Sequence, residues 1–516
     1  MRPQSSLCGW DWREKGELLM PKNILLIMTD QQRLDHTGFA PGSKVATPNI
    51  DRIAEGMGFT NCSTTNPVCT PARSALLTGR YTHQIGMLAM SGDLSQEIPT
   101  YPQALQRTGY FTAGIGKFHW LQGWHWEREF GKGHPLAAMK DAMKRYGFDA
   151  IWETSGKQLL LRNYCDYAAH LEKKGLLGAF REIQIDSMPN SDDPAVQPWD
   201  QALVWPFAEK DHVDIMTADK VLETLDHRPQ DKPFFIFCSF CSPHRPFDPP
   251  QRYLDQVPYE EVDDFIPGVV PLSEETKKKL YRFRQYYRAL IRLIDEQVGR
   301  IFARLEDLNL LDDTVILFTT DHGEMMGDHN RSEKACAYRE SVTVPTAIRH
   351  PDYLRHAITD TPIELTDLTA TILDVAGLDP QAALATPWPF GGMAIPGRSL
   401  LPLLRGEIEQ LRELAFAEGI GTHLTPAGRS PVRWEMATSQ RYKYIRFIDL
   451  FINLRNPSPE SYLQEEFFDL FQDPQEQVNL IDQPGLQAVI ERCRRYCQFV
   501  NDLTPPVQTR WAPIIE

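Results

Sequence analysis

Long apolar runs are absent from this sequence of 516 residues. A membrane-crossing helix needs about 20 mostly apolar residues in succession, whereas "NILLIM" ends in Thr and Asp after a few positions. The first 30 residues also lack the apolar core of a secretory signal peptide. We therefore expect no membrane partner. Residues 1–20 are interpreted as an N-terminal extension, with Met20 as an alternative natural start.

Positive charge is in short supply as well. Lys and Arg number 54 against 69 Asp and Glu, which gives a formal net charge of −15. Nucleic acids and anionic membrane surfaces attract proteins through excess positive charge. The balance therefore argues against a nucleic-acid partner, although it leaves room for a small basic pocket.

Cysteines are scattered and lack a pairing pattern. Their number, nine, is odd, which fits the thiols of a reducing compartment better than a disulfide framework. We therefore predict a cytoplasmic location. Cys238 and Cys241 form a C-x-x-C within an apolar run. Because no second pair accompanies them, core packing is favoured over a zinc or redox site.

Four apolar runs end in polar residues. "NILLIMTDQQ", "GYFTAGIGKFHW", "KPFFIFCSFCSPH" and "DTVILFTTDHGE" are typical of buried strands. Helical patterns lie between them, so the sequence predicts an α/β fold with a largely parallel sheet. Ligands bind beyond the carboxyl ends of such strands. The residues at those ends are therefore expected to share one site: Asp30, Gln31, Lys117, His119, His244, Asp321 and His322.

The chain is predicted to divide near residue 405. "PGRSLLPLLRGE" closes a large domain over residues 21–405. Beyond it, "RWEMATSQRYKYIRFI" and "EEFFDLFQDPQEQVNL" indicate antiparallel strands, and "LQAVIERCRRYCQFVNDL" indicates a terminal helix. Residues 406–516 are therefore predicted to form a smaller α+β subdomain. Residues 124–210 show little periodicity and are interpreted as an elaborated insertion near the site.

Asp30, Gln31, Asp321 and His322 offer two carboxylates, an amide oxygen and an imidazole. Such oxygen-rich sets suit a hard divalent cation. We expect one ion, Ca²⁺ before Mn²⁺ or Mg²⁺. Taken singly, each acidic residue is more simply explained as a turn residue after a strand. Two strand ends with matched acceptors favour a shared metal site.

Five residues that carry or can acquire a positive charge form a second group. If they converge they make an anion pocket, because Arg grips an oxyanion with two parallel bonds and Lys acts as a mobile point charge. Solvated helix charges and a loop histidine are the simpler explanations of single members. The five are Arg73, Lys117, His119, His244 and Lys334.

Cys69 stands at the start of a predicted helix in "TTNPVCTPARSALLTGRY". Pro71 suits a first helical turn, and the free N–H groups of a helix N-terminus attract anions. Free cysteines are mostly core residues. This segment alone therefore leaves a core cysteine and an anion-site thiol equally open.

The same segment carries a family resemblance. "CTPAR" matches the C-x-P-x-R signature of type I sulfatases, in the alkaline-phosphatase-like superfamily. The chain also resembles them in "NILLIMTDQQR", "GIGKFHW", "SPHRPF", "TTDHGEMMGDHNRSEK" and "EEFFDLFQDPQEQVNL", hence over nearly its whole length. The resemblance implies an alkaline-phosphatase-like sandwich: a large, mostly parallel sheet flanked by helices, with a smaller C-terminal α+β domain containing an antiparallel sheet.

In sulfatases of this type the signature cysteine is oxidised to formylglycine by a formylglycine-generating enzyme. The resemblance implies that Cys69 becomes an aldehyde, whose hydrate binds the metal with one oxygen and attacks the sulfur of an organic sulfate monoester. The alcohol leaves, and the second hydroxyl then expels sulfate as the aldehyde reforms. The expected substrate is a small-molecule or sugar sulfate ester.

The resemblance also implies a role for each candidate residue. Arg73 orients the diol, and Lys117 and Lys334 bind sulfate oxygens. His244 protonates the leaving alkoxide, and His119 acts as a base toward the diol. The metal ligands are Asp30, Gln31, Asp321, His322 and the modified residue derived from Cys69.

One position departs from the common family pattern. Many sulfatases have two adjacent carboxylates where this chain has Asp30 and Gln31. The Asp-Gln form also occurs in choline-sulfatase-like enzymes and in phosphonate monoester hydrolases, while "GKFHW" favours the sulfatases. The alternatives are a phosphonate monoester or phosphodiester hydrolase, and an inactive anion-binding homologue with unmodified Cys69.

Contacts to the alcohol part of the substrate have weak candidates only. Trp120, Trp124 and Trp126 either line a pocket or pack, and large aromatics favour packing. Arg433 and His423 are candidates to reach the cleft from the smaller domain. An oligomer is compatible with the sequence.

Overall fold

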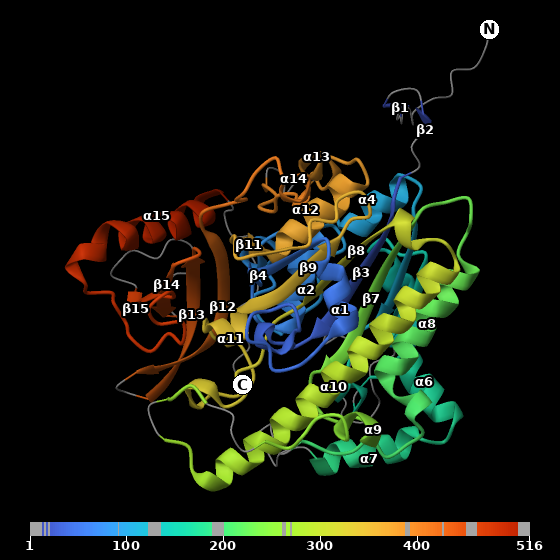
Figure 1. The fold of residues 1–516 in the computed structure, drawn as a ribbon, viewed down its shortest axis with the longest axis horizontal. Coiled ribbons are helices and arrows are strands. Elements are labelled where there is room, and N and C mark those ends of the chain that lie inside the picture. Colours follow the sequence, from blue (N-terminus) through green and yellow to red (C-terminus); the bar gives the residue numbers. More distant parts are fainter. Residues whose placement is uncertain are drawn as a thin grey trace.

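The structure is a computed structural model with a nine-stranded, a four-stranded and a two-stranded sheet and the helices around them (Figure 1). Trp124 and Trp126 lie outside the described residues, as do part of the predicted insertion and most of the predicted N-terminal extension. In residues 1–20, only β1 (Arg13–Glu14) and β2 (Glu17–Leu18) are described. The structure describes residues 13–14, 17–18, 21–90, 92–121, 136–161, 163–187, 201–260, 265–268, 271–386, 393–425, 428–449 and 462–503.

A nine-stranded sheet forms the centre of the larger part of the molecule. Within it, β9 runs antiparallel to both neighbours, and the other pairings are parallel. The predicted largely parallel sheet is therefore confirmed. The spatial order is β10 (Ala357–Thr359), β4 (Met57–Ser63), β9 (Thr343–Arg349), β8 (Thr314–Thr320), β3 (Asn23–Asp30), β7 (Phe234–Pro243), β5 (Phe111–Gly116) and β6 (Ala150–Glu153), with β11 (Ile363–Glu364) paired to β4.

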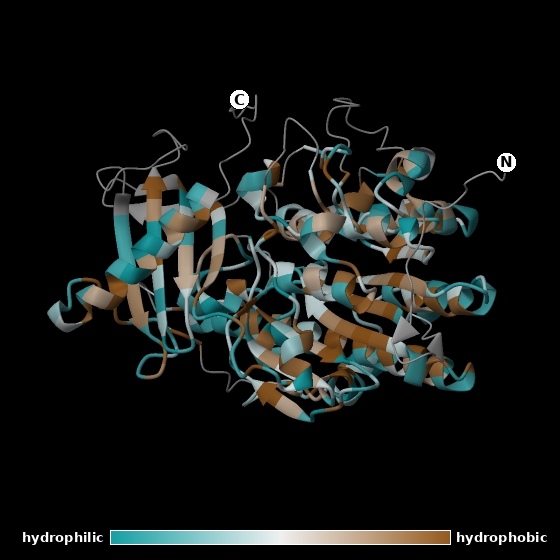
Figure 2. Ribbon diagram, turned by 90° about the horizontal axis from the view of Figure 1, so that it is seen from above, coloured by the Kyte–Doolittle hydropathy of each residue, from teal (hydrophilic) through white to brown (hydrophobic). Residues whose placement is uncertain are grey.

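Alternate residues of β3 face two separate apolar layers. Ile24 and Leu26 belong to one buried cluster, and Leu25 and Ile27 belong to the other, as expected for a strand buried on both faces. Figure 2 shows the apolar strands between helices. The first cluster includes residues of α2 (Cys69–Thr78), α4 (Tyr101–Arg107) and α12 (Leu365–Val375), and the second includes residues of α1 (Pro48–Ala54), α8 (Val213–His227) and α10 (Glu274–Asp307).

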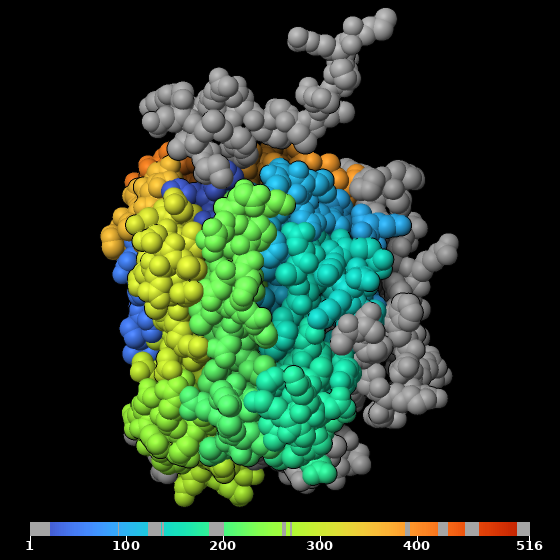
Figure 3. All heavy atoms as spheres, turned by 90° about the vertical axis from the view of Figure 1, so that its right-hand side faces the viewer, coloured from blue at the N-terminus to red at the C-terminus, as the bar shows by residue number. Residues whose placement is uncertain are grey.

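Helices α8 and α10 lie side by side and cover one outer face of the molecule (Figure 3). None of the helices in the described ranges has both the length and the apolar character that a membrane crossing requires. The shorter helices are α3 (Thr82–Ile85), α5 (Lys140–Lys144), α6 (Asp166–Lys173), α7 (Leu177–Ser187), α9 (Gln251–Leu254), α11 (Arg339–Val342), α13 (Pro380–Ala383) and α14 (Leu401–Arg405).

A separate four-stranded antiparallel sheet lies beside the large sheet (Figure 1). One apolar face packs against the terminal helix, where Cys493 and Cys497 join Phe416 and Tyr444 in one buried cluster. The predicted antiparallel sheet and terminal helix are therefore confirmed. The elements are β12 (Ala415–Thr425), β13 (Gly428–Thr438), β14 (Tyr442–Asp449), β15 (Tyr462–Asp469) and α15 (Gln487–Leu503).

Several residues that the sequence offered as possible site residues are buried and have structural contacts instead. Trp120 is 1% exposed and stacks on Phe118. Cys238 and Cys241 are both buried and belong to two different apolar clusters, which matches the predicted core packing. Arg433 is a buried ion-pair residue, bonded to Glu418 and Glu435. The side chain of His423 lies outside the described residues.

The central position of β3 predicts a high cost for truncating its buried side chains. Leu26 is fully buried, so L26A should lower the free energy of unfolding by about 2–5 kcal/mol. Urea unfolding followed by circular dichroism measures the loss. L354A is the matched control, because Leu354 is 40% exposed and should shift stability by about 0.5 kcal/mol or less. Equal losses in both variants would contradict this assignment of the core.

Candidate active site

The strand ends that the sequence analysis groups together are adjacent in the sheet. The order β8-β3-β7-β5 places the segments after these parallel strands at one edge. Asp30 is the last residue of β3, Lys117 follows β5, His244 follows β7, and Asp321 follows β8. The structure therefore brings these predicted residues to one edge of the sheet.

Cys69 lies at the centre of that edge. It is the first residue of α2, is 1% exposed, and follows Val68 at the N-cap. Its Sγ lies 3.1 Å from His322 Nε2 and 3.9 Å from Asp30 Oδ1. The Nζ atoms of Lys334 and Lys117 lie 3.5 and 3.7 Å from the same sulfur. The side chain is therefore buried and lies among charged groups, which favours an anion-site thiol over a cysteine that only packs in the core.

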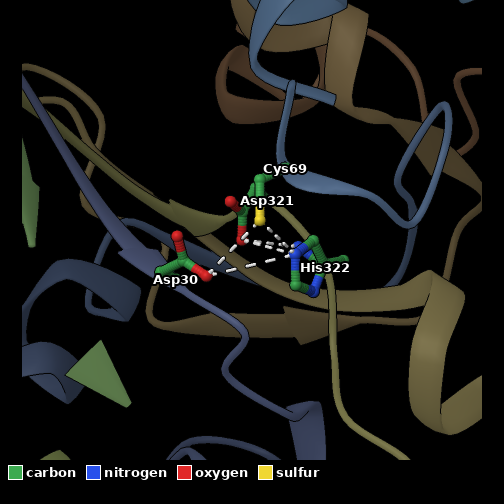
Figure 4. Close-up of side chains that lie close together, drawn as sticks. All are labelled: Asp30, Cys69, Asp321 and His322. Carbon is green, nitrogen blue, oxygen red and sulfur yellow. Dashed lines mark hydrogen bonds and ion pairs between the residues drawn. The ribbon is translucent and has the colours of Figure 1, made fainter. Parts of the chain in front are cut away.

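Four side chains converge closely enough to share one ion (Figure 4). One potential ligand atom from each of them lies within 4.8 Å of all the others. His322 uses Nδ1 to bond the Gly323 carbonyl at 2.9 Å, which leaves Nε2 directed at the cluster. All four are buried: Asp30, Cys69, Asp321 and His322.

Arg73 holds the two carboxylates of this cluster in place. Its Nε donates to Asp321 at 2.7 Å, and its Nη2 donates to Asp30 at 3.1 Å. The third nitrogen, Nη1, donates to the Lys117 carbonyl at 2.7 Å and to Ser239 Oγ at 2.8 Å. Arg73 is 1% exposed. A buried guanidinium needs partners of this kind because an unpaired charge is costly to bury.

Lys117 and Lys334 both lie beside the cluster, but each bonds a different side chain. Lys117 Nζ pairs with Asp30 Oδ2, whereas Lys334 Nζ donates to Gln31 Oε1 at 2.7 Å. Because both ammonium groups also lie within 3.7 Å of Cys69 Sγ, they can present positive charge to an anionic group held at residue 69.

The two predicted histidines differ in their bonding. Both ring nitrogens of His119 are buried without a hydrogen-bond partner within the described ranges, and its backbone φ is +65°. His244 bonds the Arg245 carbonyl through Nδ1 at 2.9 Å. Burial lowers the pKa of each imidazole well below its usual range, and nearby lysines lower it further. With no ester or cation bound, the neutral form of each imidazole is therefore favoured.

The positive groups also set the ionisation of the cluster. Burial by itself raises the pKa of the Asp30 carboxyl, but Lys117, His244 and Arg73 outweigh it and hold that pKa well below its usual range. Burial and Asp30 likewise raise the pKa of the Cys69 thiol, yet Lys117, Lys334 and His322 leave it below its usual value. Anionic groups are thus favoured at both positions.

The donor chemistry of the cluster fits a divalent cation. Asp30 and Asp321 supply carboxylates, His322 supplies an imidazole nitrogen, and these atoms already lie within 4.8 Å of one another. Gln31 Oε1 points to the same side, because it bonds Lys334, whose Nζ contacts Cys69. Carboxylate and amide oxygens suit Ca²⁺, Mg²⁺ and Mn²⁺.

Three further side chains support the site without a clear signal in the sequence. Ser239 accepts from Arg73. Glu324 accepts from the Gln31 amide, and its place shortly after Asp321 in "DHGE" is the one hint available. Lys157, from the predicted insertion, donates to Ser242, Pro246 and Asp248 and so fixes the loop around His244.

Comparison with known proteins agrees with this geometry. The Sulfatase family model matches residues 22–378, and a model described as N-sulphoglucosamine sulphohydrolase, C-terminal, matches residues 327–500. An arylsulfatase of Clostridium perfringens is 27% identical over 497 residues, covering 92% of this chain and 93% of the relative. A choline-sulfatase of Rhizobium meliloti is 26% identical over 491 residues, covering 90% and 83%.

Among solved structures, the phosphonate monoester hydrolase of Agrobacterium radiobacter has the same fold. Its TM-score is 0.71 at 21% identity, with 94% of this chain and 96% of that chain covered. Because the family model spans more than half of the sequence, the chain belongs to the sulfatase family of the alkaline-phosphatase-like superfamily. It is accordingly a sulfuric ester hydrolase, and the resemblance noted in the sequence is confirmed.

The lysines around Cys69 predict a measurable shift in thiol chemistry. In metal-free protein with an unmodified Cys69, K334M removes a positive charge 3.5 Å from the sulfur. The pKa of the thiol should therefore rise, and the pH midpoint of its alkylation should move up by about 1–3 pH units. Iodoacetamide labelling with peptide mass spectrometry measures the midpoint. K232M is the control, because Lys232 precedes β7 at the other end of the sheet; an equal shift there would exclude a local effect.

Proposed function

We propose that the protein hydrolyses an organic sulfate monoester through a formylglycine derived from Cys69 by a formylglycine-generating enzyme. The observation that carries this proposal is the position of Cys69. Its side chain begins α2 and lies within 3.9 Å of Asp30, His322, Lys117 and Lys334. A nucleophile at this point has both cationic groups and potential metal ligands within reach.

Asp30, Gln31, Asp321 and His322 would hold one divalent cation, together with an oxygen of the modified residue 69. Bound there, the cation would supply positive charge that favours the ionised form of a hydroxyl and offsets charge on the ester. Ca²⁺ is our first candidate because three of the four side chains are oxygen ligands. Mn²⁺ and Mg²⁺ are the alternatives.

The reaction proceeds in two steps at residue 69, a displacement at sulfur followed by elimination of sulfate. One hydroxyl of the hydrated aldehyde attacks sulfur, a new S–O bond forms, and the bond from sulfur to the substrate alcohol breaks. The second hydroxyl then loses its proton to His119, a carbonyl forms, and the bond to the sulfated oxygen breaks. Inorganic sulfate leaves, and water rehydrates the aldehyde. Neutral His119, with no competing partner on either ring nitrogen in the described structure, suits this role as a base.

The remaining side chains handle charge and position. Arg73 holds Asp30 and Asp321 and orients residue 69 from within α2. Lys117 and Lys334 bind the sulfate oxygens, and each such contact is typically worth about 10²–10³ in turnover. The negative charge of the bound sulfate ester favours the protonated form of His244, whose Nε2–H is then donated to the leaving alkoxide while its Nδ1–H stays bonded to the Arg245 carbonyl.

The substrate is proposed to be a small-molecule or sugar sulfate ester. The names of the arylsulfatase and choline-sulfatase relatives support aryl and choline sulfates as first candidates. A panel of aryl, alkyl, choline and sugar sulfates, assayed by sulfate release, identifies the alcohol. Release of sulfate from no member of the panel would contradict the proposal.

The organisation of the chain remains a proposal as well. We propose a catalytic domain over residues 21–405, with residues 124–210 as its insertion, and a C-terminal subdomain over residues 406–516. The last strand of the large sheet ends at Glu364 and the small sheet begins at Ala415, which supports a boundary between them. A cytoplasmic location is proposed from cysteine usage alone.

Phosphonate monoester or phosphodiester hydrolysis is the second candidate. The observation in its favour is Gln31, which replaces a carboxylate in the metal site and alters the charge around the bound ester. The fold likeness to a phosphonate monoester hydrolase is compatible with it. Comparing kcat/KM for an aryl sulfate and the matching aryl phosphonate decides between the two.

Oxidation of Cys69 is the first test of the mechanism. Mass spectrometry of the peptide spanning residues 61–73 should show an aldehyde at position 69 when the maturation enzyme is co-expressed. C69A should then abolish sulfate release while the thermal unfolding midpoint stays unchanged. C493A is the control, since Cys493 lies in the core of the small sheet. Substantial sulfatase activity in C69A would exclude the proposed nucleophile.

Proton donation by His244 predicts a dependence on the leaving group. H244A should lose about 10²–10⁴ in kcat with an alkyl sulfate, and far less with 4-nitrophenyl sulfate, whose leaving group needs no proton. In the unaltered enzyme, activity on the alkyl sulfate should fall as pH rises through the pKa of His244 in the complex. H227A is the control because His227 is exposed at the end of α8. Equal losses on both substrates would argue against an acid role.

A further inference from the structure

The side-chain amide of Gln31 is held between two groups of opposite charge. Its Nε2 donates to Glu324 Oε2, and its Oε1 accepts from Lys334 Nζ at 2.7 Å. The opposite amide orientation would place the oxygen against a carboxylate and the NH₂ group against an ammonium. Both contacts would be repulsive. The chemistry of the two neighbours therefore fixes which end of the amide faces Lys334.

Glu324 is bonded as an ionised carboxylate. It is 3% exposed, and both of its oxygens accept from N–H groups. Oε1 accepts from the backbone N–H groups of Glu333 at 2.5 Å and Met326 at 3.3 Å. Burial and Glu333 raise the pKa of the Glu324 carboxyl, whereas Lys334 and the two backbone N–H groups favour its anionic form. Because Glu333 directly precedes Lys334, the Glu324 side chain also anchors the segment that carries this lysine.

The negative charge of Glu324 lies directly behind a neutral candidate metal ligand. Gln31 contributes no charge, whereas a carboxylate at that position would carry one. Through the Gln31 amide, Glu324 polarises the carbonyl oxygen that accepts from Lys334. Side chains that orient a metal ligand from behind commonly change metal affinity by about 10–100-fold when removed.

We propose that Glu324 is a positioning residue: it orients the Gln31 carboxamide with its oxygen toward the cation site and supplies, from outside the ligand set, the negative charge that Gln31 lacks. This inference rests on the proposed cation site. It assigns the Asp30-Gln31 pair an electrostatic partner, 293 residues away from Gln31 in the sequence.

A charge swap tests the inference. Binding of Mn²⁺ and of Ca²⁺ to metal-depleted protein is measured by calorimetry for wild type, E324Q, Q31E and Q31E/E324Q, after mass spectrometry has shown the same state of residue 69 in each. E324Q keeps the shape and the acceptor oxygen, and should weaken cation binding about tenfold. In the Q31E background two carboxylates face each other, so the same E324Q change should strengthen binding.

The reversal of sign separates positioning from a structural role. If Glu324 only held the segment of residues 324–333, E324Q would weaken binding in both backgrounds. E340Q is the matched control, because Glu340 is another largely buried carboxylate whose side chain contacts His329 rather than Gln31. It should leave cation affinity within about threefold of wild type, below the tenfold effects expected at a supporting group.

Two different failures can be told apart. If wild type binds the cation, D30N loses it, and E324Q acts with the same sign in both backgrounds, the inference about Glu324 is overturned and the proposed cation site stands. If wild type binds neither cation, or D30N binds as tightly as wild type, the proposed site itself is wrong and the inference falls with it. Thermal unfolding of every variant shows that the compared proteins are folded.

Discussion

The buried guanidinium of Arg73 is the interaction on which the site depends. It bonds Asp30 at the end of β3, Asp321 after β8, the Lys117 carbonyl after β5 and Ser239 in β7. One side chain near the start of α2 thus ties four neighbouring strands to the helix that begins with residue 69. Losing either carboxylate would leave a buried charge without its partner, which is strongly unfavourable.

The sheet makes that interaction geometrically available. Because β8, β3, β7 and β5 are adjacent and parallel, their carboxyl ends meet at one edge. The alternating side chains of β3 fill the two apolar layers on either side. The helices of those layers bury the strands completely, so the polar residues gather where the strands end. Each of these strands therefore has apolar packing residues along its length and the polar residues of the site at its carboxyl end.

Charge in the site is arranged in pairs rather than in blocks. Asp30 is shared by Arg73 and Lys117, and the Gln31 amide is shared by Lys334 and Glu324. The ammonium groups of Lys117 and Lys334 also lie within 3.7 Å of Cys69 Sγ. An anion at that residue therefore meets positive groups already held in place, and little reorganisation is needed when charge develops during the reaction.

The sequence by itself determined four strands of the large sheet, the start of α2 at Cys69 and the candidate residues at the strand ends, because burial and helix-start patterns are local properties of the chain. The family resemblance added their chemical roles. Only the tertiary structure decided the contacts of Ser239 with Arg73, of Glu324 with Gln31 and of Lys157 with the His244 loop. Such contacts depend on the direction of side chains from segments far apart in the chain, and that direction is set by how strands and helices pack together. No local pattern encodes it.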